Sequence, residues 1–180
     1  SQVRRRVKKL KKKNKKFDDY LSKKIIKNLN FSLTTNQTKI INEINNDLMS
    51  DFKMFRLLQG DVGSGKTIIS FIAAANVIKS NWQVALMAPT EILAKQHYNL
   101  ATKIFKSTNV NIEFLSGKSD VGEKKLIQEK LTNGKINFLV GTHALFQKSI
   151  LFKNLGLIII DEQHKFGVKQ RIELSNKGGK

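Results

Sequence analysis

An α/β fold, with a parallel sheet covered by helices on both faces, is predicted by two features of this 180-residue sequence. Short apolar runs alternate with helical patterns, which is typical of successive βαβ units. Polar segments follow the apolar runs, and one of them has the spacing of a phosphate-binding loop. Because ligands bind at the carboxyl edge of such sheets, the sequence predicts a nucleotide site there.

The phosphate-loop spacing lies between Gly60 and Thr67, where a glycine and four residues precede Gly-Lys-Thr. Gly60, Gly63 and Gly65 leave the backbone free to turn its N–H groups towards a triphosphate. Lys66 would place positive charge on the outer phosphates, and the Thr67 hydroxyl would bind Mg²⁺. The alternative is a glycine-rich turn with an incidental lysine. The expected strand before the loop and the apolar helix after it favour a P-loop NTPase fold.

The remaining elements follow from periodicity and turn residues. Strands are predicted at 55–59, 83–88, 111–115, 136–140 and 155–160, and helices at 68–79, 91 to about 105, and roughly 122–131. An earlier amphipathic helix carries Ile40, Ile41, Ile44 and Leu48 at helical spacing, with Thr34 or Thr35 as its N-cap. Polar motifs end the strands, so five separate segments are expected to converge on one site.

The last strand is followed by a second candidate catalytic element. Asp161 comes directly after an apolar run, so its carboxylate could hold Mg²⁺, and Glu162 is placed to orient or deprotonate water. His164 is expected near the γ-phosphate. The alternative is an acidic strand end that caps a helix or forms a surface ion pair. The three histidines lack metal-ligand spacing, so His97 and His143 are interpreted as hydrogen-bonded structural groups.

Positive charge is concentrated at the start of the chain. Residues 1–30 hold thirteen Lys and Arg against Asp18 and Asp19, a net charge of +11 out of +19, so the other 150 residues carry +8. Nucleic acid is the commonest partner of such a chain. Because the segment lacks the apolar pattern of a core element, it is interpreted as a solvated tail with a possible short helix over 20–29. A linker and a segment that docks on DNA phosphates both remain open.

Composition excludes several other classes of site. The sequence has no cysteine, which excludes disulfides and thiolate chemistry and fits a reducing cytoplasm. No apolar run approaches the ~18 residues of a membrane span. We expect a fragment of a longer protein, because the chain starts at Ser1 rather than Met and ends at Lys180 after a polar stretch.

Taken together, the motifs resemble the RecG family of bacterial ATP-dependent DNA helicases, in superfamily 2. The resemblance covers residues 31–180 and rests on Leu57 to Thr67, Ala88 to His97, Gly141 to Leu145, and the DExH box with its continuation, Asp161 to Arg171. The transcription-repair coupling factor is a near relative, but it usually has Phe in place of Ser64 and Glu in place of Gln163.

The resemblance implies specific roles for matched positions. Catalysis would fall to Lys66, Asp161, Glu162 and His164, with ATP and Mg²⁺ as cofactors and Thr67 and Asp161 as metal ligands. ATP would be held by Phe31, Gln37, Gly60, Gly63, Ser64, Gly65, Lys66 and Thr67, with Phe31 and Gln37 at the adenine. Backbone contacts to DNA would come from Pro89, Thr90, Glu91, Gly141, Thr142 and His143.

The resemblance also implies a larger parent protein. Residues 31–180 would be the first RecA-like domain, the helicase ATP-binding domain, incomplete at its C-terminus, and residues 1–30 the connector from a wedge domain upstream. A second RecA-like domain would supply an arginine finger. The parent is then expected to unwind branched DNA in repair and recombination, whereas this chain alone would hydrolyse ATP poorly.

Two functions of other classes remain as alternatives. A non-catalytic nucleic-acid-binding module would use the basic tail and the strand-end loops to grip phosphates. A nucleotide-dependent switch or a small-molecule kinase fits the phosphate loop, but it leaves the DExH box and the strand-end motifs without a purpose.

Overall fold

The computed structural model describes residues 4–6, 20–28, 32–48, 54–58 and 65–161. Within these residues, one sheet has the strand order β1-β2-β6-β3-β5-β4. All neighbouring strands are parallel except β1, which pairs antiparallel with β2 at one edge. The strands are β1 (Arg4–Arg6), β2 (Met54–Leu58), β3 (Gln83–Met87), β4 (Ile112–Leu115), β5 (Phe138–Gly141) and β6 (Leu155–Asp161). The predicted parallel α/β sheet is confirmed.

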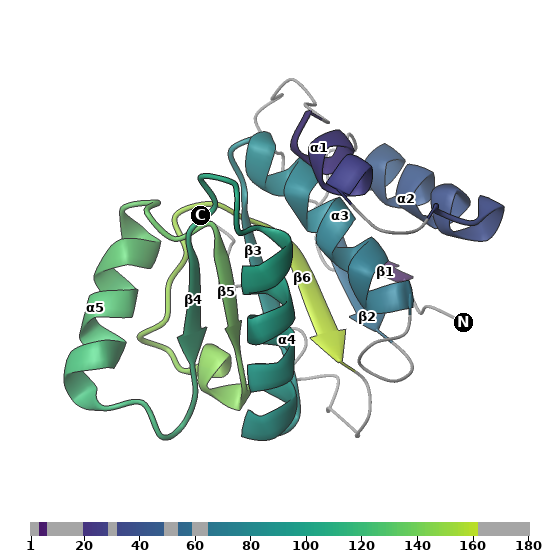
Figure 1. Cartoon of the computed structure of the whole chain (residues 1–180). Coiled ribbons are helices and arrows are strands. Elements are labelled where there is room, and N and C mark those ends of the chain that lie inside the picture. Colours follow the sequence, from purple (N-terminus) through teal and green to yellow (C-terminus); the bar gives the residue numbers. More distant parts are fainter. Residues whose placement is uncertain (1–3, 7–19, 29–31, 49–53, 59–64, 162–180) are drawn as a thin grey trace.

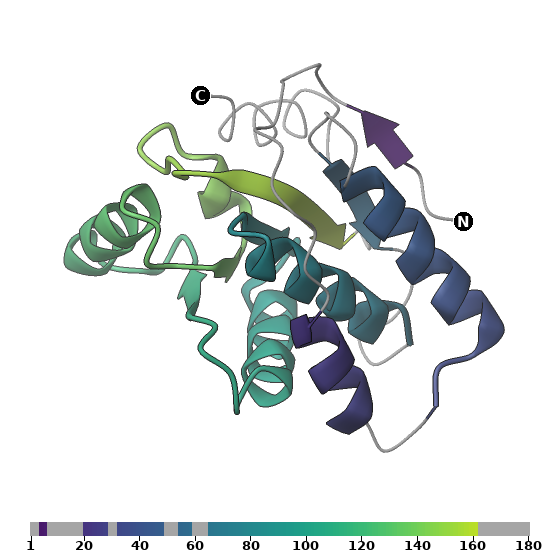
Figure 2. The ribbon, with the colours of Figure 1, turned by 90° about the horizontal axis from the view of Figure 1, so that it is seen from above.

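Helices cover both faces of this sheet (Figures 1 and 2). One face carries α1 (Tyr20–Asn28), α2 (Thr35–Leu48), α3 (Gly65–Lys79) and α4 (Glu91–Ile104); the other carries α5 (Val121–Thr132) and the 3-10 helix η1 (His143–Phe146). Every helix predicted from periodicity is present, with ends shifted by at most a few residues. None of the described helices has the length and hydrophobicity that a membrane crossing requires.

The strands alternate between two hydrophobic cores. Val84 and Leu86 of β3 pack into the core beneath α3 and α4, whereas Ala85 and Met87 pack into the core beneath α5. This alternation follows from the two-residue period of a strand. All four side chains are fully buried, as expected for a parallel strand covered on both faces.

Helix α3 is buried nearly all round because other helices cover it. Its residues from Phe71 to Ile78 are all buried, and α1 and α2 pack on the side that faces away from the sheet (Figure 2). A helix that is apolar on every side is stable only when it is enclosed in this way. The packing fixes the start of α3, and with it the end of the phosphate loop.

The short helix expected over 20–29 is confirmed, but the expectation of a solvated tail is wrong for residues 20–28. They form α1, whose Leu21 and Ile25 are 8% and 3% exposed and belong to the core around α3. These two residues and the partly buried Ile26 are enough for docking, because α3 offers an uncovered apolar side. The basic residues Arg4–Arg6 also depart from the expectation, because they form the edge strand β1.

Candidate nucleotide and nucleic-acid site

The carboxyl ends of the parallel strands lie at one edge of the sheet. In the strand register, Leu58 of β2 is opposite Asp161 of β6, and Met87 of β3 is opposite Gly141 of β5, which in turn is opposite Leu115 of β4. Figure 1 shows the arrowheads of β4, β5 and β6 pointing the same way. The polar segments that follow these strands therefore start side by side, as the sequence predicts.

Asp161 is a buried carboxylate at this edge. Its side chain is 2% exposed, and its Oδ2 is 2.8 Å from Nε2 of His97, which is 1% exposed and comes from α4. Among the described residues, the second oxygen, Oδ1, has no hydrogen-bond partner. Burying a carboxylate oxygen without a partner is costly, so the site is built to receive a further ligand.

The Thr67 hydroxyl is suited to the same kind of ligand as the Asp161 carboxylate. It lies in the first turn of α3 and is 3% exposed. A hydroxyl and a carboxylate are hard oxygen donors of the kind that Mg²⁺ takes, and Mg²⁺ in nucleotide sites completes its shell with phosphate oxygens and water. The unpaired Asp161 Oδ1 and the Thr67 hydroxyl are therefore suited to Mg²⁺, because both are oxygen donors.

Several predicted site residues lie outside the described residues. These are Phe31, Gly60, Gly63, Ser64, Glu162 and His164. Gly65 and Lys66 are described by their backbone, which forms the first residues of α3. The roles expected of all these residues stay predictions. The position of Lys66 at a helix N-terminus agrees with its expected role, because N-terminal N–H groups attract phosphate.

The segment after β3 begins α4 with a polar cap. Thr90 is the N-cap, and its hydroxyl accepts a hydrogen bond of 3.2 Å from the Leu93 N–H. Glu91, in the first turn, forms an ion pair of 3.5 Å with Lys118 from the loop after β4. Thr90 is exposed, and Glu91 and Pro89 are half-buried. The predicted DNA contacts at this segment are thus accessible, and Lys118 adds a cation beside them.

The segment after β5 is mostly buried. A Cβ at Gly141 would collide with the Leu115 carbonyl oxygen of the neighbouring strand, so this position needs glycine for packing. The Thr142 hydroxyl, 4% exposed, caps η1 by accepting from the Ala144 N–H at 3.5 Å. His143 is exposed. Of these three predicted contact residues, His143 is the one whose side chain reaches solvent.

Gln37 has a local structural role that the sequence analysis did not assign to it. Its Oε1 accepts a hydrogen bond of 2.9 Å from the Thr34 N–H, and the Thr34 hydroxyl accepts one of 3.1 Å from the Gln37 N–H. This reciprocal pair is a capping box, which makes Thr34 rather than Thr35 the N-cap of α2. The adenine contact expected of Gln37 stays a prediction.

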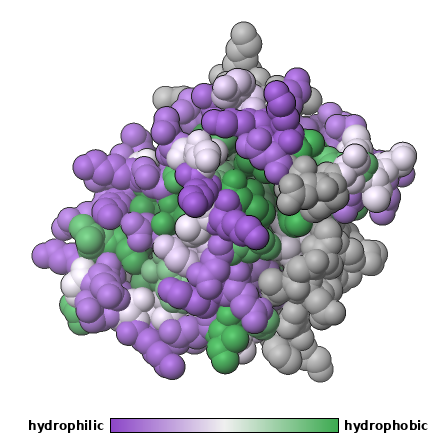
Figure 3. Space-filling model, viewed as in Figure 1, coloured by the Kyte–Doolittle hydropathy of each residue, from purple (hydrophilic) through white to green (hydrophobic). Residues whose placement is uncertain are grey.

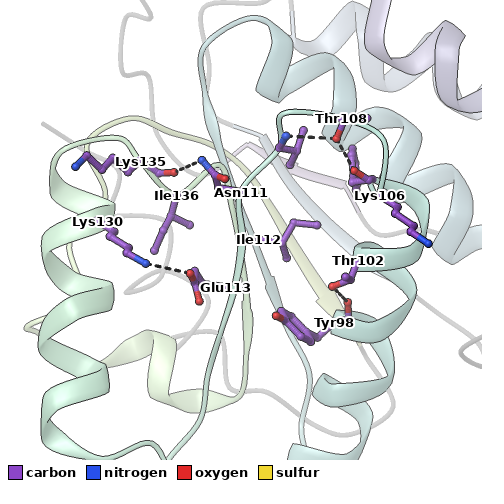
Figure 4. Close-up of a pocket in the computed structure, with 12 residues that line it drawn as sticks. Tyr98, Thr102, Lys106, Thr108, Asn111, Ile112, Glu113, Lys130, Lys135 and Ile136 are labelled. Atoms are coloured by element: carbon purple, nitrogen blue, oxygen red, sulfur yellow. Dashed lines mark hydrogen bonds and ion pairs between the residues drawn. The ribbon is translucent and has the colours of Figure 1, made fainter.

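A separate hollow lies beside the edge strand β4. A cavity of about 510 Å³ is lined by residues of α4, β4 and α5, including Tyr98, Glu113 and Lys130 (Figure 4). Lys130 and Glu113 form an ion pair of 3.3 Å within it. The cavity extends to Asn111, before the start of β4, so it opens towards the amino ends of the strands and away from Asp161. On the described part of the face seen in Figure 3, hydrophilic side chains alternate with hydrophobic ones.

Comparisons with known proteins agree with this geometry. A family model described as DEAD/DEAH box helicase matches residues 34–177. The ATP-dependent DNA helicases RecG of Thermotoga maritima and Aquifex aeolicus are 48% and 50% identical to this chain over 164 and 161 residues. These alignments cover 91% and 89% of this chain but 21% and 20% of the relatives. The chain therefore spans about a fifth of the length of the curated relatives it matches.

Two solved structures of helicases are also similar to this chain. A structure of RecG bound to a three-way DNA junction matches with a TM-score of 0.77 and 46% identity, and the match covers 85% of this chain and 21% of that one. The helicase MrfA bound to DNA has a TM-score of 0.50 at 18% identity, which shows likeness of fold alone.

Sequence reasoning missed the partner of His97. The sequence predicts that His97 is a hydrogen-bonded structural group, which is confirmed, but it does not identify Asp161 as the partner. One signal was available: His97 lies on the same helix face as Ala94 and Ala101, which are both buried. A histidine on the apolar face of a helix that follows a strand-end motif is a candidate partner for a strand-end acid.

Proposed function

The chain belongs to the DEAD/DEAH box helicase family, and we propose that it is the ATP-binding motor domain of a RecG-type helicase that unwinds branched DNA. The observation that carries this proposal is the buried carboxylate of Asp161, with an unpaired oxygen, at the strand edge where α3 also begins. The identity of 46–50% to several RecG helicases supports the finer assignment. Because the chain spans a fifth of these relatives, the activity belongs to the parent protein.

The proposed chemistry is phosphoryl transfer to water. Mg²⁺, when bound, would supply positive charge that offsets the charge of the outer phosphates of ATP. Thr67 and Asp161 would hold this ion, and Lys66 would place its charge on the β- and γ-phosphates. Glu162 would orient the attacking water and accept its proton, and His164 would sense the γ-phosphate. The glycines at 60, 63 and 65 would let the backbone approach the triphosphate.

DNA would lie across the carboxyl edge of the sheet. Thr90 and His143 are the exposed polar residues of the two predicted contact segments, and Lys118 is an exposed cation beside Glu91. Contacts of this kind bind the phosphate backbone and fix register without reading sequence. A second RecA-like domain and a wedge domain of the parent would complete the DNA site, with residues 1–30 as the connector from the wedge.

One prediction separates DNA binding by the strand-end loops from DNA binding by the basic tail. We replace Lys11, Lys12, Lys13, Lys15 and Lys16 by glutamine, which leaves α1 in place. If the strand-end loops bind DNA, this variant still binds single-stranded DNA, and the slope of log affinity against log salt falls by at most about 3 to 4, the contribution of five phosphates. Binding is measured by fluorescence anisotropy at several salt concentrations.

The control for this experiment is ATP hydrolysis by the same variant, which should be unchanged in the absence of DNA. Loss of all DNA binding in the glutamine variant would contradict the proposed site and favour the basic tail as the only nucleic-acid-binding element.

A second prediction concerns adenine recognition by Gln37. The substitution Gln37→Glu keeps an acceptor for the Thr34 N–H, so the capping box and the thermal stability of the chain are retained. It removes the amide donor that an adenine edge requires. We expect the preference for ATP over GTP to fall by about tenfold, the loss of roughly one hydrogen bond of 1–2 kcal/mol, as measured by competition with a fluorescent nucleotide.

The matched control is Thr34→Ala, which weakens the cap by about 1 kcal/mol but leaves the Gln37 amide in place. If Thr34→Ala reduces ATP preference as much as Gln37→Glu does, Gln37 acts through the helix start and does not contact adenine.

A further inference from the structure

Histidine 97 joins two elements that are far apart in the sequence. It lies on α4, which packs over β4 and β5, whereas Asp161 ends β6, and β3 lies between β5 and β6 in the sheet. The hydrogen bond of 2.8 Å between His97 Nε2 and Asp161 Oδ2 therefore links the helix that starts at Thr90 to the strand end where the nucleotide site is proposed.

This bond uses only one oxygen of the carboxylate. Among the described residues, neither Asp161 Oδ1 nor His97 Nδ1 has a hydrogen-bond partner. A buried histidine and aspartate that served packing alone would be expected to satisfy both carboxylate oxygens, because each unmet acceptor is costly. The arrangement instead bonds Oδ2 to His97 and leaves Oδ1 without a partner among the described residues.

We propose that His97 is a positioning residue for Asp161: by donating its Nε2–H to Oδ2, it fixes the rotation of the carboxylate and presents Oδ1 to Mg²⁺. The inference rests on the proposed function, since it presupposes Mg²⁺ at Asp161. Residues that hydrogen-bond a metal-binding carboxylate fix its orientation, and their loss typically reduces metal affinity about 10- to 100-fold.

The position of His97 gives this bond a second consequence. His97 lies seven residues after the N-cap Thr90, which is about two helical turns along a rigid helix. The hydrogen bond is thus a direct contact between the helix that begins beside the predicted DNA segment and the proposed metal ligand Asp161.

The test compares Mg²⁺ affinity in three forms of the 180-residue chain. Binding of a fluorescent ADP is titrated with Mg²⁺ in wild type, His97→Leu and His97→Gln. The glutamine amide can place an N–H near the position of Nε2, so we expect His97→Gln to stay within about threefold of wild type, and His97→Leu to lose about 10- to 100-fold in apparent Mg²⁺ affinity. Binding of ADP in EDTA should be similar in all three.

A matched control separates positioning from loss of stability. Phe105, 2% exposed, packs in the core at the far end of α4, and Phe105→Leu perturbs that core without touching Asp161. We expect Phe105→Leu to lower the melting temperature but to keep the Mg²⁺ affinity of wild type. Equal loss of Mg²⁺ affinity in Phe105→Leu and His97→Leu would overturn the proposal.

Wild-type protein offers a measurement that needs no variant. In ¹⁵N-histidine NMR spectra, the Nε2–H signal of His97 should shift when Mg²⁺ is added to the ADP complex and should not shift when Mg²⁺ is added without nucleotide. If wild type shows Mg²⁺-dependent ADP binding but His97→Leu keeps it, or the Nε2–H signal does not respond, His97 has no positioning role. Absence of Mg²⁺-dependent binding in wild type would instead overturn the proposed function, and this inference with it.

Discussion

We expect the 180-residue chain to hydrolyse ATP about 10³- to 10⁵-fold more slowly than its parent protein on forked DNA, the factor that an arginine finger supplies in P-loop NTPases. The chain holds the phosphate-loop sequence and the buried Asp161, but it spans about a fifth of its relatives. By the family resemblance, the arginine would come from a second RecA-like domain. Binding of nucleotide should survive, since the phosphate loop lies within this chain.

The measurement is steady-state hydrolysis by the chain and by the parent, with and without forked DNA, alongside binding of a fluorescent nucleotide. Addition of the second domain as a separate protein should restore part of the rate. Robust DNA-stimulated hydrolysis by the chain alone would mean that it stabilises the transition state by itself, and the account of it as half of a motor would be wrong.

The second large effect is expected from Lys66→Ala. Lys66 is in the first turn of α3, and its charge would lie on the β- and γ-phosphates. Loss of one such group from a dry, preorganised site typically lowers the rate by about 10²- to 10³-fold. In the parent protein we expect at least this loss in ATP hydrolysis, with DNA binding unchanged, because the predicted DNA contacts lie on other segments.

Lys79→Ala is the matched control for this substitution. It removes a lysine from the other end of the same helix, where the residue is exposed and remote from the strand edge. Lys79→Ala should leave hydrolysis unchanged. A Lys66→Ala variant with the hydrolysis rate of wild type would show that the loop does not bind the reacting phosphates.

Much of the fold could be predicted because its signals are local. The strand before Asp161 is a continuous apolar run, which is what a parallel strand buried on both faces requires. Helix α4 was expected from its apolar spacing and its start after Pro89 and Thr90, and the structure adds the Thr90 cap. The convergence of strand ends followed from βαβ topology and is confirmed by the register of Leu58 with Asp161.

What could not be predicted depends on contacts between distant residues. The burial of α1 depends on the uncovered side of α3, which comes later in the chain, so the local pattern predicts a short helix but not its burial. The steric need for glycine at 141 depends on the position of Leu115 in the adjacent strand. The bond from His97 to Asp161 joins residues 64 positions apart. Local periodicity in the sequence gives no information about contacts between such distant residues.

Gln37 is a different case, because its structural role was visible in the sequence. Threonine followed three residues later by glutamine is the pattern of a capping box. The bond from Thr34 N–H to Gln37 Oε1 confirms that pattern. Because Oε1 is used in the cap, an adenine contact would have to use the Gln37 amide N–H, or Oε1 would have to leave Thr34. Gln37→Glu removes the amide N–H and keeps the acceptor, so it tests the first of these.

The central claim is that this domain uses ATP to drive the separation of branched DNA, and unwinding of a three-way junction by the parent protein tests it most directly. Fluorescently labelled junctions are incubated with wild type and with Lys66→Ala, each with ATP and with a non-hydrolysable analogue. The account predicts strand separation only by wild type with ATP, while both proteins bind the junction. Unwinding by Lys66→Ala, or unwinding of equal rate with the analogue, would contradict the account.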